Sequence, residues 1–241
     1  MILTVPCLLG LEALVANEMR RLDLRGVRAE NGRVHCEGSF ADIARLNINL
    51  RCGARVLMEY HPDAKAQGRK TEYSLAAVYK GKLLINMDSQ APNAAAKEWL
   101  DNGGFWSAVG QKPENIRREV IYGQSRFDLA FTLGGKPAFM EVKGVTLEKE
   151  GVAMFPDAPT ERGVKHLEEL AGAVKDGFEA FVLFVIQMKG VRVFRPNEEM
   201  HKAFADALRK AEDAGVKVLA YDCDVREDGF VIDDAVACRL R

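Results

Sequence analysis

The sequence has no long hydrophobic run, no Cys-x-x-Cys pair and no glycine-rich loop of the kind that cradles phosphates. A membrane-spanning helix needs about 20 consecutive apolar residues, and no segment approaches that length. The N-terminus has no basic region and cleavage site typical of a signal peptide. The five scattered cysteines indicate neither a disulfide framework nor a zinc site. We therefore expect a cytoplasmic protein with reduced thiols and no membrane partner.

Composition describes an ordinary globular chain. It has 241 residues, of which 48% are hydrophobic and 29% charged, enough for one large domain or two modest ones. A net charge of −1 gives no overall attraction to nucleic acid. Repeats and low-complexity tracts are absent from the sequence. Evidence on function must therefore come from local motifs.

The first 60 residues predict a small α+β unit. Apolar periodicity, a Ser39 N-cap and the Asn31-Gly32 turn signal define its elements. The expected elements are strand 1–6, helix 10–24, strands 27–30 and 33–37, helix 40–50 and a closing strand 56–60. The order β-α-β-β-α-β is that of a ferredoxin-like unit.

Residues 61–102 are expected to form a second, smaller segment. A polar stretch at 61–70 reads as a linker or long loop. It is followed by a hairpin of strands 73–79 and 82–88 around Gly81, and then by a short helix at 93–102.

Residues 103–241 predict a mixed α/β domain. The apolar run 181–187 is typical of a strand buried on both sheet faces. Thr160 is a suitable N-cap for the first of two amphipathic helices. Trp106 is expected to pack in a core. The expected elements are strands 119–122, 127–133, 138–143, 181–187, 191–195 and 216–222, and helices 160–176 and 198–214.

The most informative motif is Asp128 followed by Glu141-Val142-Lys143, with a Gly134-Gly135 turn between them. Alternation places Glu141 and Lys143 on one strand face, and antiparallel pairing allows Asp128 to lie beside Glu141. Two neighbouring carboxylates can hold a hard divalent cation. The lysine can orient a water or offset phosphate charge. This arrangement predicts phosphodiester hydrolysis.

A structural interpretation competes with the catalytic one. Glu-x-Lys patterns arise by chance in charged chains, as Asp63-Ala64-Lys65 shows. Glu141 and Lys143 could be a solvated strand face with cross-strand pairing. Arg162, Lys165 and His166 are close enough in sequence to reach a phosphate near strand 138–143, or they could form a solvated helix face.

Several runs resemble the sugar fermentation stimulation protein A (SfsA) family over about residues 53–241. The runs are Arg69-Lys70-Thr71-x-Tyr73, Asp88-Ser89-Gln90-Ala91-Pro92-Asn93, Tyr122-Gly123-x-Ser125-Arg126-Phe127-Asp128, Glu141-Val142-Lys143-Gly144-Val145-Thr146-Leu147 and Phe155-Pro156-Asp157-Ala158-x-Thr160-Glu161-Arg162-Gly163-x-Lys165-His166-Leu167. The resemblance implies OB-like strands followed by a PD-(D/E)XK nuclease-like mixed-sheet domain.

By position, the resemblance implies roles for particular residues. Asp128 and Glu141 would bind Mg²⁺ or Mn²⁺, Lys143 would be the active-site lysine, and Glu119 would be an upstream acid. The supporting residues would be Arg126, Arg162, Lys165 and His166.

The N-terminal segment resembles a different family. Val5-Pro6-Cys7-x-x-Gly10-Leu11-Glu12-Ala13-Leu14 and Glu30-Asn31-Gly32-Arg33-Val34 are similar to the ferredoxin-like segment of THUMP-type rRNA guanine methyltransferases. The segment replaces the first OB strands of SfsA proteins, so 61–102 would form only a partial OB-like sheet. Exposed strand edges there would be covered by residues 1–60 or paired in a homodimer.

The first functional reading is a Mg²⁺- or Mn²⁺-dependent nuclease acting on DNA or RNA, with DNA favoured. The alternative is a non-catalytic DNA-binding regulator on a nuclease fold. A third reading is a structural or dimerisation module without nucleic acid. No residue supports a role in sugar metabolism.

Overall fold

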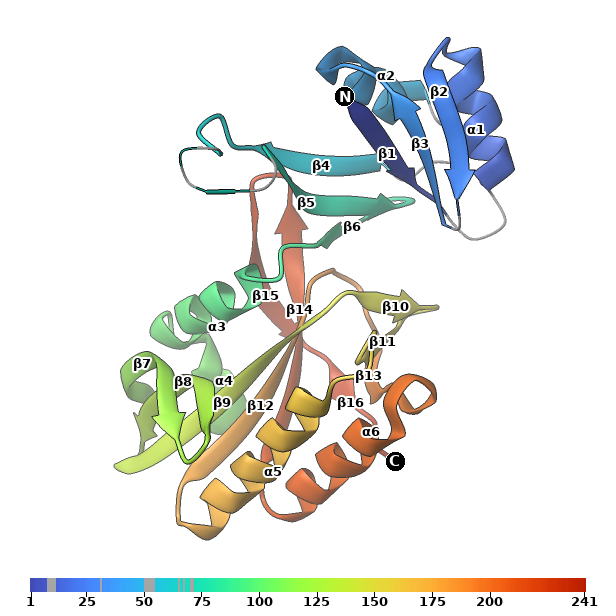
Figure 1. The fold of residues 1–241 in the computed structure, drawn as a ribbon. Coiled ribbons are helices and arrows are strands. Elements are labelled where there is room, and N and C mark those ends of the chain that lie inside the picture. Colours follow the sequence, from blue (N-terminus) through green and yellow to red (C-terminus); the bar gives the residue numbers. More distant parts are fainter. Residues whose placement is uncertain (8–11, 31, 50–54, 65, 67, 70–71) are drawn as a thin grey trace. The chain divides into compact units, whose positions relative to one another are not determined.

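The computed structural model describes residues 1–7, 12–30, 32–49, 55–64, 66, 68–69 and 72–241. The chain divides into two compact units, Met1–Leu83 and Leu84–Arg241, and each has its own hydrophobic core (Figure 1). Gly10, Asn31 and Cys52, on which predictions were made, lie outside the described residues. The other four cysteines are free. None of the helices in the described ranges combines the length and apolar character that crossing a membrane requires.

The N-terminal unit follows the predicted order of elements. These are β1 (Ile2–Pro6), α1 (Glu12–Arg21), β2 (Arg25–Glu30), β3 (Arg33–Glu37), α2 (Phe40–Asn49), β4 (Arg55–Tyr60) and β5 (Tyr73–Lys80), with β6 (Leu83–Asn86) crossing into the second unit.

A three-stranded sheet, ordered β1-β3-β2, carries the first core. Strand β1 is antiparallel to β3, with Leu3 opposite Cys36 and both side chains buried. Helix α1 buries Val15 and Met19 against this sheet, and α2 adds Leu46. Periodicity predicted that Val15 and Met19 face the core, and they do, whereas Leu14, predicted on the same face, is 53% exposed.

The prediction that residues 56–60 close the ferredoxin-like sheet was wrong. Strand β4 instead pairs antiparallel with β5, and β4, β5 and β6 form a separate sheet. Tyr60 lies opposite Tyr73, and their rings stack with centroids 4.9 Å apart. Such cross-strand aromatic pairs stabilise a ladder by about 0.2–1 kcal/mol. The neighbouring strand in sequence thus supplies the partner for β4.

The second unit contains most of the chain. Its helices are α3 (Ala91–Asp101), α4 (Gly104–Val109), α5 (Glu161–Lys175) and α6 (Glu198–Asp213). Its strands are β7 (Pro113–Tyr122), β8 (Ser125–Leu133), β9 (Lys136–Val145), β10 (Leu147–Lys149), β11 (Val152–Phe155), β12 (Glu179–Ile186), β13 (Val193–Pro196), β14 (Lys217–Arg226), β15 (Gly229–Ala235) and β16 (Ala237–Cys238). The predicted 102/103 boundary falls inside this unit, because α3 packs on its sheet.

A six-stranded mixed sheet forms the centre of this unit, in the order β15-β14-β12-β9-β8-β7. Strands β7, β8 and β9 are antiparallel neighbours, whereas β12 runs parallel to both β9 and β14. The side chains from Phe181 to Ile186 in β12 are all fully buried. A strand covered on both faces has this continuous apolar sequence, as predicted.

Helices cover both faces of the sheet (Figure 1). On one face α3 and α4 contribute Trp99 and Phe105, and Phe105 contacts Phe131 and Phe181 edge-on at 5.4 and 5.2 Å. On the other face α5 and α6 lie side by side (Figure 1). The second face carries the candidate site.

Trp106 does not pack in the core, so that prediction was wrong. Its side chain is 59% exposed, while the adjacent Phe105 is fully buried. Helix α4 has only six residues and turns a single large side chain inward. Glycine at position 104 lets the start of α4 lie close to the Trp99 ring, because a Cβ there would be 2.2 Å from that ring.

Candidate functional site

The β8–β9 hairpin carries the two predicted carboxylates at the end away from its turn. Gly134 and Gly135 in the turn have φ of 57° and 80°, values that glycine adopts readily. Leu129 lies opposite Met140, so Asp128 and Glu141 occupy the next positions on the two strands. The predicted neighbourhood of the two carboxylates therefore follows from the strand register.

Asp128 is held by two hydrogen bonds. The backbone N–H of Val142 donates to its Oδ2 at 2.8 Å, and the Nδ2 of Asn93 donates to its Oδ1 at 2.8 Å. Burial raises the pKa of Asp128, the charge of Glu141 raises it further, and the two hydrogen bonds oppose these effects. The carboxylate is thus fixed in orientation, and ionising it in the folded protein costs free energy.

Glu141 is buried, with 2% of its surface exposed. Two donors converge on its Oε1, Lys143 Nζ at 2.6 Å and His166 Nδ1. Its Oε2 is buried and has no hydrogen-bond partner. Burial pushes the pKa of Glu141 upward, but the His166 hydrogen bond and the Lys143 charge outweigh it, so the pKa is lowered overall. Glu141 is therefore an anion with one oxygen engaged and the other unpartnered.

His166 reaches the site from α5. Thr160 caps this helix as predicted, its Oγ1 accepting from the N–H of Gly163 at 3.1 Å. Two turns of helix later His166 is 5% exposed. Arg162, one turn earlier, donates from Nε to His166 Nε2 at 3.3 Å. Arg162, His166 and Glu141 thus form a continuous chain of hydrogen bonds.

Three further predicted residues do not contact this cluster in the described part of the chain. Glu119 and Arg126 form an ion pair at 3.5 Å, each with 57% of its side chain exposed. Glu119 has a positive φ of 54° and is at the strand position opposite Asp128. Lys165 lies 3.7 Å from Glu169 across one helical turn. The structure therefore groups Asp128, Glu141, Lys143, His166 and Arg162.

Asn93 is a site residue that the sequence did not single out. It lies in the first turn of α3, next to Pro92. The contact with Asp128 spans 35 residues of sequence. In the sequence, Asn93 belongs to the Asp88–Asn93 run that resembles the SfsA family, but the resemblance gave no residue of that run a role.

Gly144, the residue after Lys143 in β9, is closely packed by Gln187 and Pro92. The Nε2 of Gln187 donates to Asn86 Oδ1 at 2.8 Å and to the backbone oxygen of Asp88 at 3.1 Å. A Cβ on Gly144 would lie 2.5 Å from Gln187 Oε1 and 2.8 Å from Pro92 Cγ. Glycine is required at this position because the two side chains fill the space.

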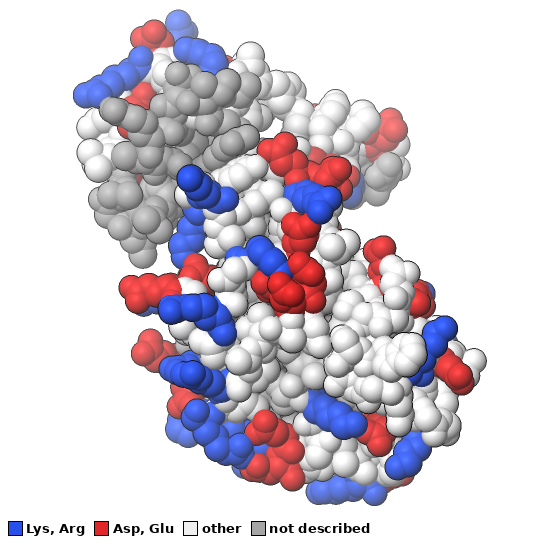
Figure 2. Space-filling view, turned by 180° about the vertical axis from the view of Figure 1, so that it is seen from behind, with Lys and Arg blue, Asp and Glu red and all other residues white. Residues whose placement is uncertain are grey.

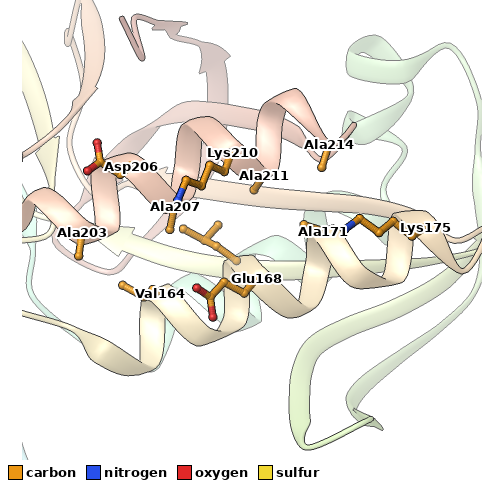
Figure 3. Close-up of a pocket in the computed structure, with 11 residues that line it drawn as sticks. Val164, Glu168, Ala171, Lys175, Ala203, Asp206, Ala207, Lys210, Ala211 and Ala214 are labelled. Atoms are coloured by element: carbon orange, nitrogen blue, oxygen red, sulfur yellow. The ribbon is translucent and has the colours of Figure 1, made fainter.

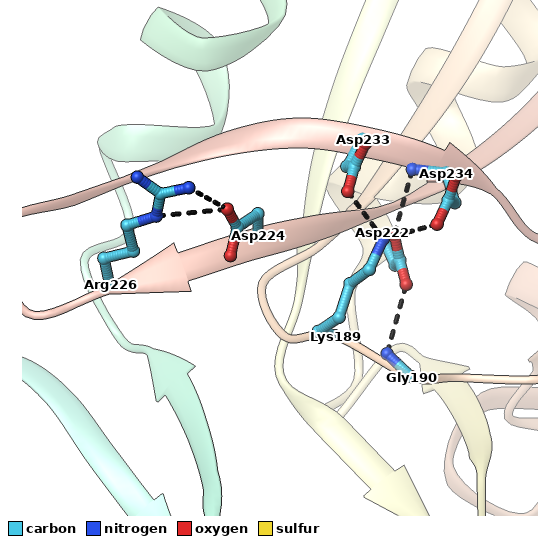
Figure 4. A network of polar contacts seen from close by, with 7 residues as sticks. All are labelled: Lys189, Gly190, Asp222, Asp224, Arg226, Asp233 and Asp234. Carbon is cyan, nitrogen blue, oxygen red and sulfur yellow. Dashed lines mark hydrogen bonds and ion pairs between the residues drawn. The ribbon is translucent and has the colours of Figure 1, made fainter.

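A separate acidic cluster lies where β14 and β15 meet (Figure 4). Lys189 Nζ contacts carboxylate oxygens of Asp222, Asp233 and Asp234 at 2.9, 2.7 and 2.6 Å. Burial opposes the charge on Lys189, but the three hydrogen bonds raise the pKa of its ammonium group. Asp222 also accepts from the N–H of Gly190 at 3.1 Å. The ammonium group of Lys189 is therefore the positive charge that the three aspartates surround. These contacts also hold the turn after β12 against β14 and β15.

A groove of 510 Å³ runs between α5 and α6 (Figure 3). Small side chains, chiefly alanines, form its floor, and Glu168, Lys175, Asp206 and Lys210 lie along it. None of its lining residues contacts Asp128 or Glu141 through a hydrogen bond in the described structure. The groove is thus distinct from the carboxylate cluster.

The fold and the site define a two-unit α/β protein. Its central sheet carries two neighbouring carboxylates, Asp128 and Glu141, and a lysine, and helix α5 adds a buried histidine. Residues 90–229 match the family model described as the sugar fermentation stimulation protein RE domain. The chain belongs to the SfsA family. Residues 2–57 match the RlmL ferredoxin-like domain, which confirms the second resemblance.

Curated relatives support the same family. The sugar fermentation stimulation protein homolog of Desulfitobacterium hafniense (strain DSM 10664 / DCB-2) is 52% identical over 178 residues, 74% of this chain and 76% of the relative. That of Clostridium kluyveri (strain ATCC 8527 / DSM 555 / NBRC 12016 / NCIMB 10680 / K1) is 53% identical over 175 residues, 71% of this chain and 74% of the relative. The structure of Pyrococcus furiosus SfsA in complex with Ca²⁺ has a TM-score of 0.69 at 20% identity, covering 99% of this chain and 96% of that one. The last comparison shows a shared fold.

Proposed function

We propose that the protein is a metal-dependent nuclease that hydrolyses phosphodiester bonds of DNA or RNA, with DNA favoured as substrate. The observation that carries the proposal is the buried Oε2 of Glu141, which has no hydrogen-bond partner. An unsatisfied buried acceptor costs about 1–3 kcal/mol. A divalent cation shared with Asp128 would offset this cost.

The residues present fit Mg²⁺ or Mn²⁺. Asp128 and Glu141 offer hard oxygen ligands, which these ions prefer. Burial and the charge of Glu141 raise the pKa of Asp128, and a cation between the two carboxylates would remove that repulsion. The Pyrococcus furiosus SfsA structure holds Ca²⁺, an ion that takes the same class of ligand.

The proposed chemistry gives each side chain a task. A bound Mg²⁺ or Mn²⁺ supplies Lewis-acid activation of a water and stabilises the attacking and leaving oxygens. Lys143, whose side chain is 17% exposed, would orient that water or offset charge on the phosphate. Asn93 and the Val142 N–H hold Asp128 in place. Arg162 is exposed, and its terminal nitrogens would bind a phosphate oxygen.

The PD-(D/E)XK assignment is part of this proposal. Its support is an Asp-bearing strand paired with a central Glu-x-Lys strand, with α5 packed alongside. Lys, Arg, Asp and Glu side chains are interspersed over the face seen in Figure 2. Because the net charge is −1, the chain as a whole does not attract a phosphate backbone, so affinity would come from contacts at the site.

The experiment that tests the proposal is a cleavage survey. Labelled single- and double-stranded DNA and RNA are incubated with the purified chain in Mg²⁺, in Mn²⁺ and in EDTA. Asp128→Asn and Glu141→Gln are compared with Asp224→Asn, a matched strand aspartate that pairs with Arg226 at the surface. We expect cleavage in metal, loss of about 10²–10³-fold in either site variant, and wild-type rates for Asp224→Asn.

Cleavage that persists in EDTA, or that survives Asp128→Asn, contradicts the proposal. Binding of nucleic acid without cleavage under any metal would favour a non-catalytic DNA-binding regulator. If a binding titration detects no nucleic-acid binding and no dependence on salt concentration, a structural module would be favoured.

A further inference from the structure

The hydrogen bonds on Glu141 are distributed unequally between its two oxygens. Lys143 and His166 both donate to Oε1, whereas Oε2 is buried without a partner. A carboxylate held through one oxygen cannot rotate without breaking both bonds. The geometry therefore fixes the direction in which Oε2 points.

The ring of His166 is itself held in one orientation. It is 5% exposed and lies edge-on to Phe127, with centroids 6.4 Å apart. Arg162 donates to its Nε2. Because an arginine Nε always carries a hydrogen, Nε2 must accept, and the ring hydrogen lies on Nδ1, facing Glu141. Arg162 thus selects the tautomer that can donate to the carboxylate.

We infer that His166 is a positioning residue for the cation site, directing Glu141 Oε2 toward the ion through the hydrogen bond at Oε1. This inference rests on the proposed function, since it requires a cation between Asp128 and Glu141. His166 does not contact the ion or the reacting phosphate in this role. Outer-shell partners of this kind commonly contribute 10–100-fold to metal affinity.

Lys143 cannot replace His166 in this role. Its ammonium sits on a flexible stem, its side chain is partly exposed, and it belongs to the same strand as Glu141. His166 comes from a capped helix, and its ring is held by the edge-on contact with Phe127 and the hydrogen bond from Arg162. Removing His166 would leave Glu141 tethered only by a mobile group, free to adopt other rotamers.

The test measures Mn²⁺ affinity without nucleic acid, from the electron paramagnetic resonance signal of free Mn²⁺ during titration. His166→Ala removes the donor, whereas His166→Asn keeps a side-chain N–H close to the position of Nδ1. His35→Ala is the matched control, because His35 is a partly buried histidine of the N-terminal unit that bonds to Thr4 and Glu30. Thermal unfolding verifies that each variant is folded.

We expect Mn²⁺ to bind His166→Ala about 10–100-fold more weakly than wild type. His166→Asn should recover most of that loss, and His35→Ala should bind like wild type. If wild type binds Mn²⁺ and a folded His166→Ala binds it equally, the inference fails while the proposed function stands. If His166→Ala does not fold, His166→Asn decides, since weak binding by a folded Asn variant contradicts positioning through the N–H. If wild type binds no Mn²⁺, the proposed function fails as well.

Discussion

Asn93 donates a hydrogen bond from its Nδ2 to Asp128 Oδ1 at 2.8 Å, joining the first turn of α3 to the strand that carries the aspartate. This bond joins one helical layer to strand β8 of the central sheet. Together with the Val142 N–H it leaves Asp128 a single orientation. The cation site proposed here depends on that orientation.

Replacing Asn93 by alanine should lower both stability and cleavage. The loss of one hydrogen bond to a partly buried carboxylate costs about 1–3 kcal/mol, and each kcal/mol lowers Tm by about 2–4 °C in a chain of this size. Asn102→Ala is the matched control, because Asn102 ends the same helix with an exposed side chain and caps it only through its backbone. Equal Tm values for the two variants, measured by calorimetry, would show that the Asn93 bond contributes nothing.

Asp128→Asn should abolish cleavage, and its stability in EDTA relative to wild type should rise with pH. The folded-state pKa of Asp128 is raised, by burial first and by Glu141 second. The folded protein therefore holds a proton more tightly than the unfolded chain, and stability falls as pH rises from about 4, the ordinary aspartate value, through the raised one. Asparagine has no such proton to lose.

The stability difference between Asp128→Asn and wild type should thus grow as pH rises through that window and then level off. Like charges at close range commonly cost on the order of 1 kcal/mol, or about 2–4 °C in Tm. Melting curves in EDTA at pH 4 to 8 give the comparison. A stability difference that does not shift in favour of Asp128→Asn between pH 4 and pH 8 without metal would contradict this prediction.

Gly144→Ala should destabilise the protein. The new Cβ would lie 2.5 Å from Gln187 Oε1 and 2.8 Å from Pro92 Cγ, and such overpacking costs about 1–3 kcal/mol. Gly172→Ala in α5 is the control, since nothing lies within 4 Å of its Cβ position. Alanine there should stabilise the helix by up to about 1 kcal/mol. Denaturant midpoints that move in the same direction for both variants would overturn this packing argument.

Lys189→Met should destabilise the second unit by leaving the buried Asp222 without its ammonium partner (Figure 4). Asp222 keeps the backbone N–H donors of Gly190 and Asp234 but loses its hydrogen bond to a charged group, which costs about 1.5–3 kcal/mol. The double variant Lys189→Met with Asp222→Asn should recover part of the loss, because the buried charge is then gone. Urea unfolding of the single and double variants measures the coupling. Additive losses would mean that the two residues do not act together.

The hairpin site was predictable because its determinants are local. Asp128 and Glu141 are joined by a short turn, and alternation along each strand decides which side chains share a face. The tertiary contacts were not predictable in the same way. Asn93 reaches Asp128 across 35 residues and His166 reaches Glu141 across 25, and periodicity alone does not show which helix packs over which strand.

Two errors have the same origin. Residues 56–60 were assigned to the ferredoxin-like sheet from element order, but pairing with β5 brings Tyr60 against Tyr73. Trp106 was predicted to pack in a core, yet the short helix α4 turns Phe105 inward and leaves Trp106 exposed. In both cases the tertiary packing of the segment, which the local sequence pattern does not show, decided the outcome.

The most direct test of the central claim is single-turnover cleavage of the preferred labelled nucleic acid in Mn²⁺, by wild type and by Asp128→Asn, with Asp224→Asn as control. We expect cleavage by wild type and the control, none in EDTA, and a rate at least about 100-fold lower for Asp128→Asn. Equal rates for wild type and Asp128→Asn would contradict the claim.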